Sequence, residues 1–286
     1  TGIYATGDKF DPDAASYADT LKSATYYQAK FATEEQVDTI WEKPAAFSLF
    51  DDNGKQVFTQ NVGIRIAGSF GRGRAQKGFN VIARKEYGKG SMEYPFFENR
   101  PYTEYKAVVL RAGAQDQNRS KIRDELASGL LEGTDINILY QAYRPTVLYL
   151  NGEYWGHYEI TEKLSDDYIE AHYGIDKNDV CLIKNGELEE GTESDFAEWE
   201  SLQNWFTSND LSQTSNYNQL CEKIDMQSFI DYMCAEIYYG NMDFSPNNTA
   251  MWKSTSVYSD NEWGDGKWRF ILFDTEYSTG LYGGMG

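Results

Sequence analysis

The sequence predicts an α+β fold, with a β-rich first half and a helix-rich second half. Strand-length apolar runs separated by turn residues recur through residues 45–160, and segments with helical periodicity and capping residues follow from residue 166. The character changes near residue 163. We therefore expect residues 1–163 to form a β-rich lobe with one long helix, and residues 164–286 to form a helical lobe.

In the first half, two turn signals predict β-hairpins. Asp51-Asp52-Asn53-Gly54 follows a weakly alternating segment, and Asn151-Gly152 separates two strand-like runs at 145–150 and 154–160. The long helix is predicted over residues 120–132, where Gly133 ends a pattern of apolar residues four apart. Those apolar residues are Ile122, Leu126 and Leu130, and further strands are expected at 62–66, 79–83 and 107–110.

In the second half, three helices are expected at 166–172, 195–206 and 226–239. The last begins after Asp225, a capping residue, and ends at Gly240. Its predicted apolar face consists of Phe229, Ile230, Met233 and Ile237. An apolar strand at 268–273 then ends on Asp274.

The composition limits the classes of partner. The net charge is −19, from 45 acidic and 26 basic residues, so nucleic acids and anionic membrane surfaces are unlikely ligands. No run of 18 apolar residues is present, which argues against membrane insertion. The acidity, common in secreted proteins, and a start at Thr1 without a methionine favour an extracellular location with a signal peptide removed, although an excised piece would also start this way.

The segment 240–248, with the sequence GNMDFSPNN, gives the clearest chemical signal. In an Asp-x-x-x-x-Asn loop, the carboxylate of Asp243 can orient a nucleophile while the amide of Asn248 binds Mg²⁺, which prefers hard oxygen ligands. Asp274 can supply a second ligand. Phosphoryl transfer needs this positioning and charge neutralisation. The alternative is an ordinary polar turn and an aspartate that happens to end a strand.

A glycine-rich loop at 68–74 can contribute groups that bind phosphate. It contains Ser69, Arg72 and Arg74, and Lys77 follows at the start of a strand. Backbone N–H groups and cationic side chains in such loops bind phosphate oxygens. A glycine-rich hairpin without this role, and a solvated lysine, are the alternatives.

Two further positions can add charge near a cleft between the lobes. Glu162, at the end of the hairpin strand, can line a nucleotide pocket or form a surface pair. Asp124 and its neighbours on the first-half helix can face the cleft or lie on an exposed helical face.

Four stretches resemble the CotH-kinase family of spore coat protein H-like atypical protein kinases. They are residues 120–127 (SKIRDELA), 143–158 (YRPTVLYLNGEYWGHY), 240–248 (GNMDFSPNN) and 268–274 (WRFILFD). In this order and spacing the resemblance covers about residues 60–280. It implies an atypical protein-kinase-like fold and a transfer of phosphate from ATP, with Mg²⁺ or Mn²⁺, to Ser or Thr of a protein substrate.

The resemblance also implies roles for individual residues. Asp243 matches the family's catalytic-loop aspartate, and Asn248 and Asp274 match its metal ligands. Lys77 falls in the basic strand after the glycine- and serine-containing turn, and Glu162 falls at the hinge-like strand end. The chain departs from the family in having Gln76 instead of a second lysine before Lys77. It also has Thr275-Glu276 after Asp274, so Glu276 is a further candidate metal ligand.

Two other functions remain open from the sequence. An aromatic content of 15% and the acidic charge are compatible with a non-catalytic binding or scaffold module of a secreted bacterial complex, associated with cellulose or a cell surface. Glycoside hydrolysis requires two carboxylates that face each other across a groove, and 45 acidic residues provide many possible pairs.

Overall fold

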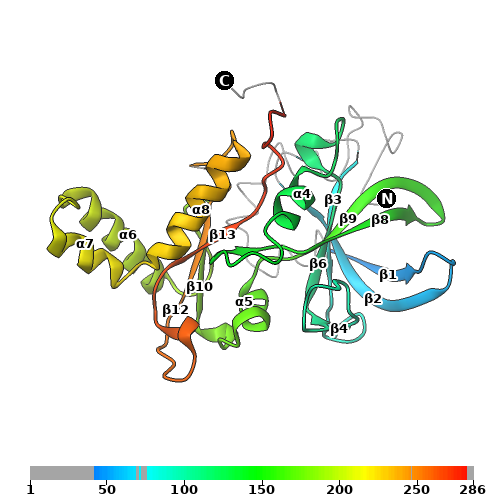
Figure 1. Ribbon diagram of the computed structural model, residues 1–286. Helices are drawn as coiled ribbons and strands as arrows, with labels where there is room; N and C mark the ends of the chain where they lie inside the picture. Colours follow the sequence, from blue (N-terminus) through cyan, green and yellow to red (C-terminus); the bar gives the residue numbers. More distant parts are fainter. Residues whose placement is uncertain (1–41, 69–70, 72–75, 246, 282–286) are drawn as a thin grey trace. The chain divides into compact units, whose positions relative to one another are not determined.

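The computed structural model describes residues 42–68, 71, 76–245 and 247–281 (Figure 1). The chain divides into two compact units, which we call the first unit (residues 1–122 and 142–163) and the second unit (residues 123–141 and 164–286). Strands and helices both contribute to the described chain, which confirms the α+β class. Residues 123–141 were expected in the β-rich lobe but belong to the second unit, because Ala127, Leu131 and Ile138 pack into its core.

The first unit is built on a six-stranded sheet in which neighbouring strands are antiparallel. The strand order is β1 (Lys43–Phe50), β2 (Gln56–Ala67), β3 (Gly78–Ile82), β6 (Ala107–Arg111), β9 (Glu153–Glu162) and β8 (Tyr143–Leu150). A separate two-stranded ribbon is formed by β4 (Met92–Glu93) and β5 (Glu104–Tyr105).

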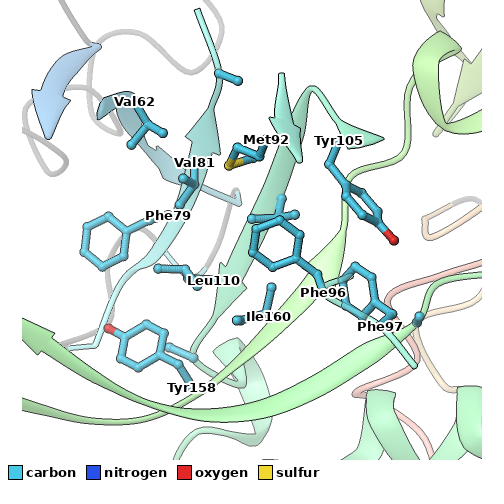
Figure 2. Packing of buried hydrophobic residues seen from close by; sticks show 14 of the residues in the cluster. Val62, Phe79, Val81, Met92, Phe96, Phe97, Tyr105, Leu110, Tyr158 and Ile160 are labelled. Atoms are coloured by element: carbon cyan, nitrogen blue, oxygen red, sulfur yellow. The ribbon is translucent and has the colours of Figure 1, made fainter. Parts of the chain in front are cut away.

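The core of the first unit lies on one face of this sheet. Alternate side chains of the central strands are buried there, among them Phe79 and Val81 of β3 and Leu110 of β6. Figure 2 shows Phe96 and Tyr105, from the segment around the β4–β5 ribbon, in the same cluster of buried side chains, and their rings pack edge to face with centroids 5.3 Å apart. Burial of each such aromatic side chain contributes about 1.5–3 kcal/mol.

The turn between β8 and β9 forms as predicted. Asn151 and Gly152 both have positive φ angles, of 51° and 82°, as a tight hairpin turn of the primed type requires. Gly156 has a φ of 123°, and a Cβ atom there would lie 2.1 Å from Nε2 of Gln76, which donates a hydrogen bond to the carbonyl of Trp155. The glycine of the Trp155-Gly156 pair is therefore required by its conformation, whereas the Gln76 side chain could shift to relieve the contact.

The second unit contains a five-stranded sheet that the sequence did not reveal. The strand order is β11 (Glu187–Glu190), β10 (Val180–Lys184), β12 (Ala250–Ser254), β13 (Arg269–Leu272) and β7 (Leu139–Tyr140). Only the β13–β7 pair among these is parallel. One cluster of buried side chains covers one face of β10 and β12, and a second cluster covers the other face. These strands therefore lack the alternation of apolar and polar residues by which a strand is recognised in a sequence.

Five α-helices lie in the described part of the second unit: α4 (Arg123–Gly129), α5 (Asp166–Tyr173), α6 (Glu193–Ser208), α7 (Thr214–Cys221) and α8 (Met226–Tyr239). Short 3₁₀ turns occur at Ala114–Asp116, Lys177–Asp179 and Glu262–Gly264. Among the described helices none has the length and apolar character needed to cross a bilayer. The three cysteines are free thiols.

Two helices present a different face to the core than the sequence predicted. Helix α4 is shorter than expected, and Leu126, together with Ile122 and Leu130 at its two ends, is about half exposed. Helix α8 has the predicted ends, but its apolar residues Phe229, Ile230 and Ile237 are exposed. The residues of α8 that are buried instead are Ser228, Tyr232, Ala235, Glu236 and Tyr239.

The buried polar groups of α8 explain this orientation, because several of them make specific hydrogen bonds. The Ser228 hydroxyl accepts a hydrogen bond from the backbone N–H of Phe270 (2.9 Å), which joins α8 to β13. The Tyr239 hydroxyl donates to the carbonyl of Ala127 (2.8 Å), which joins α8 to α4. Buried donors and acceptors must be paired, so these bonds fix which face of the helix is turned inward.

Asp225 connects the start of α8 to the sheet. Its Oδ1 accepts from the N–H of Ser228 (3.1 Å), which caps the helix. Its Oδ2 accepts from Nε of the buried Arg269 (3.1 Å) and from Nδ2 of Asn137 (3.2 Å). One carboxylate therefore caps the helix and balances part of the charge of an arginine in β13.

We predict that Asp225→Ala lowers the free energy of unfolding by about 2–4 kcal/mol, because it removes both the cap and a partner of buried Arg269. Urea denaturation followed by tryptophan fluorescence measures the change. Thr192→Ala, which removes the cap of α6 alone, is the matched control and should cost about 1 kcal/mol. Equal losses in the two variants would contradict the role of the Arg269 contact.

Candidate active site

The loop 241–248 begins where α8 ends. Gly240 adopts a left-handed conformation with a φ of 58°, and its N–H closes the helix onto the carbonyls of Glu236 and Ile237. The N–H of Asn241 donates to the carbonyl of Glu236 (3.2 Å), and the Tyr232 hydroxyl donates to the carbonyl of Asn248 (3.3 Å), so both ends of the loop are anchored to α8. Within the loop, the Asn241 side chain accepts a hydrogen bond from the N–H of Asp243 (3.2 Å).

The structure brings Asp243, Asn248 and Asp274 together. Nδ2 of Asn248 donates to Oδ2 of Asp243 (3.2 Å) and to the backbone carbonyl of Asp274 (3.2 Å). Nδ2 of Asn247 donates to the other carboxylate oxygen of Asp243 (3.1 Å). Two amides thus hold the Asp243 carboxylate, and one of them links the loop to the end of β13.

The backbone at these positions is strained. Asn248 and Asp274 have φ angles of 53° and 56°, in a region that side chains other than glycine adopt uncommonly, although Asn and Asp tolerate it best. Such conformations persist where the surroundings impose them, and they cluster at functional sites. Here the hydrogen bond between the Asn248 side chain and the Asp274 carbonyl joins the two strained residues.

The segment after Asp274 is held by α4 and α8. The backbone N–H of Thr275 donates to Oδ1 of Asp124, and the Thr275 hydroxyl donates to the same oxygen (2.8 Å). The N–H of Met242 donates to the carbonyl of Tyr277 (3.2 Å), and the N–H of Thr279 donates to the carbonyl of Tyr239 (2.8 Å). The position of Asp274 therefore depends on contacts with both helices.

Three carboxylates lie at this point of the second unit. One oxygen each of Asp124, Asp274 and Glu276 lies within 4.8 Å of the other two, and Asp124 and Glu276 are buried. Carboxylate oxygens are the hard ligands that Mg²⁺, Mn²⁺ and Ca²⁺ prefer. Asp124, for which the sequence left alternatives open, therefore lies beside the metal-ligand candidate Asp274. Glu276, the further candidate ligand, lies beside Asp274 as well.

Sequence reasoning missed Glu236, a fourth acidic residue in this region. It is 2% exposed, and burial raises its pKa to about 7. Nearby Asn241 and Tyr232 lower that pKa, whereas the negative charge of Asp124 raises it. A signal was present, because Tyr232, Ala235 and Tyr239 form a second stripe at helical spacing, and Glu236 lies on it.

The remaining predicted residues belong to the first unit or lie outside the described residues. Ser69, Arg72 and Arg74 are not among the described residues. Lys77 is 4% exposed, so it is not a solvated lysine, and its carbonyl accepts a hydrogen bond from the Tyr158 hydroxyl (2.9 Å).

Glu162 is bonded within the first unit. Its Oε2 accepts from Nε of Arg100 (3.0 Å) and from the N–H of Ala142 (2.7 Å), and its Oε1 accepts from the Tyr102 hydroxyl. Arg100 and Glu162 are both buried. The carboxylate thus closes the end of β9 and balances a buried arginine, so Glu162 does not form a surface pair.

With the fold and this geometry established, comparison with known proteins identifies the class of the chain. A family model described as CotH kinase protein matches residues 64–284, which is 221 of the 286 residues. The chain therefore belongs to the CotH kinase family. A comparison with curated proteins finds no match.

We predict that Glu162→Gln lowers the stability by about 3 kcal/mol, because it leaves the buried Arg100 guanidinium without its anionic partner. Glu104→Gln is the control, since Glu104 forms an exposed ion pair with Lys106 (3.8 Å) and should change stability by less than about 1 kcal/mol. Urea denaturation compares the two. If Glu162→Gln is as stable as the control, the buried Arg100–Glu162 pair does not stabilise the first unit.

We predict a pH-dependent effect of Glu236→Gln. The folded pKa of about 7 lies above the usual 4.5, so the wild type loses stability as the pH rises from about 4.5 to 7 and loses no more above that. The neutral variant lacks this loss and should be more stable than the wild type at pH 8, by up to about 3 kcal/mol, with no advantage below pH 4.5.

Thermal unfolding of both proteins across this pH range, with a chelator present, gives the comparison. An advantage of Glu236→Gln that did not change with pH would contradict the assigned cause, because the variant would then differ from the wild type in packing and not in charge.

Proposed function

We propose that the chain is a kinase-like phosphotransferase that uses ATP and Mg²⁺ or Mn²⁺ to phosphorylate Ser or Thr residues of a protein. The observation that carries this proposal is the convergence of Asp243, Asn248 and Asp274 in the second unit, in a chain that belongs to the CotH kinase family. The β-rich first unit and the second unit that holds this loop would be the two lobes of a kinase-like fold.

In this proposal Asp243 orients the acceptor hydroxyl. Its carboxylate is half-buried and held by the amides of Asn247 and Asn248, so its direction is set before a substrate binds. The hydroxyl oxygen attacks the γ-phosphorus, the bond from that phosphorus to the β–γ bridging oxygen breaks, and ADP leaves. The proton of the hydroxyl passes to the carboxylate of Asp243.

The metal ligands would be Oδ1 of Asn248 and the carboxylate of Asp274. Nδ2 of Asn248 is engaged with Asp243 and Asp274, whereas no described residue donates to its Oδ1, so the amide is oriented with its acceptor available for a cation. A bound Mg²⁺ or Mn²⁺ would neutralise negative charge on the ATP phosphates. These hard oxygen donors fit such an ion.

The family resemblance also implies ligands for the ATP phosphates. We propose Lys77 and the loop residues Ser69, Arg72 and Arg74 as phosphate ligands, on the basis of the family resemblance. A contact between Glu162 and the nucleotide stays a prediction, and its carboxylate already accepts three hydrogen bonds. The extracellular location, and a protein substrate within a bacterial surface or secreted complex, are likewise proposals supported by the net charge of −19 and the resemblance.

We expect the wild type to transfer radiolabelled phosphate from ATP to itself or to dephosphorylated casein when Mn²⁺ is present. Asp243→Asn and Asp274→Asn should each reduce the rate at least about 100-fold, because they remove a charge that acts in the transition state. Asp260→Asn, an equal change at an exposed position, should leave the rate unchanged.

Two results would refute the phosphotransferase. One is a wild type that neither incorporates phosphate nor binds ATP in the presence of metal. The other is full activity in Asp243→Asn.

A further inference from the structure

The carboxylates of Asp124, Asp274 and Glu276 come from segments far apart in the chain. Asp124 lies on α4, and the other two flank Thr275, which is 151 residues further on and bonded to Asp124. The family resemblance implies a metal role for Asp274, the sequence offers Glu276 as a further candidate, and Asp124 is added by the structure. Three negative groups held this close, two of them buried, repel one another strongly in a medium of low dielectric.

A second observation is the position of Glu236. It is 2% exposed, and among the described residues none makes a hydrogen bond of normal geometry to either of its carboxylate oxygens. The negative charge of Asp124 contributes to the raised pKa of Glu236, so the two carboxylates interact electrostatically. A buried polar group without such a bond is costly, and an ion or an ordered water is the usual explanation for one in a native protein.

We propose that Asp124, Asp274 and Glu276 bind one divalent cation in the absence of nucleotide, with Glu236 as a further buried carboxylate that interacts with Asp124. This site goes beyond the proposed function, in which Asn248 and Asp274 hold a metal together with ATP. It shares only Asp274 with that site, and it can exist whether or not the chain transfers phosphate.

The geometry indicates which ions fit. The three ligand oxygens lie within 4.8 Å of one another, which is close enough for one divalent cation to contact all three. Carboxylates alone favour hard cations such as Mg²⁺, Mn²⁺ and Ca²⁺ over zinc or copper.

Such an ion would join α4 to the segment that carries Asp274. That connection includes the two hydrogen bonds from Thr275 to Asp124 and the bond from Nε of Arg123 to the Thr279 hydroxyl (3.1 Å). A cation shared by Asp124, Asp274 and Glu276 would add ligand bonds on both sides of Thr275. It would fix the Asp274 carboxylate before ATP arrives.

Electron paramagnetic resonance of Mn²⁺, titrated into chelator-treated protein without nucleotide, tests this site. We expect one bound Mn²⁺ per chain, displaced by Ca²⁺. Asp124→Asn and Glu276→Gln should each weaken binding about tenfold or more, because each removes a charged ligand. Asparagine at position 124 keeps an Oδ1 that can accept from Thr275, so the local hydrogen bonds are preserved.

Asp260→Asn, which changes an exposed carboxylate, is the matched control and should bind Mn²⁺ without nucleotide as the wild type does. The proposal is overturned if the wild type binds no Mn²⁺ without ATP, or if both ligand variants bind it with wild-type affinity. Absence of phosphotransfer in a wild type that binds Mn²⁺ would refute the proposed function and leave the cation site standing.

Discussion

The second unit depends on the contact between Thr275 and Asp124. Two donors of Thr275 converge on a single oxygen of Asp124, and Thr275 stands between the two acidic residues Asp274 and Glu276. The hydrogen bonds that fix Thr275 therefore also restrict the positions of Asp274 and Glu276. Helix α4, which carries Asp124, is itself held by the hydrogen bond from Tyr239 to Ala127 and by the packing of Ala127 and Leu131. The position of the candidate metal ligand Asp274 is therefore an outcome of how α4 and α8 pack.

This arrangement concentrates negative charge in a buried region. Asp124, Glu236 and Glu276 are all buried, and Asp274 is half-buried beside them. Burial of like charges opposes folding unless protons or cations compensate it. The raised pKa of Glu236 is one form of compensation, since the carboxyl can stay protonated near neutral pH. A bound cation would be another, and it would connect the stability of the second unit to the ion that the proposed chemistry needs.

Local signals in the sequence predicted the parts of the fold that local geometry determines. Asp225 and Gly240 predicted the ends of α8, and Asn151-Gly152 predicted the β8–β9 turn. These signals are reliable because a capping position, or a position with a positive φ, accepts only a few residue types. The β10 and β12 strands escaped prediction because both of their faces are buried. In the site, Asp243, Asn248 and Asp274 follow the ends of regular elements and could be proposed together. Glu236 was missed because the more apolar face of α8 was taken as the buried one, whereas tertiary hydrogen bonds decide which face is buried.

The central claim is that the loop after α8 and the residue after β13 form one metal site for a nucleotide. A crystal structure of the chain with Mn²⁺ and a non-hydrolysable ATP analogue, with anomalous scattering to locate manganese, tests it most directly. The account predicts a manganese ion bound by Oδ1 of Asn248, the carboxylate of Asp274 and phosphate oxygens of the analogue, with the γ-phosphate near Asp243. A nucleotide bound with its phosphates away from these three residues, or manganese found only elsewhere, would contradict it.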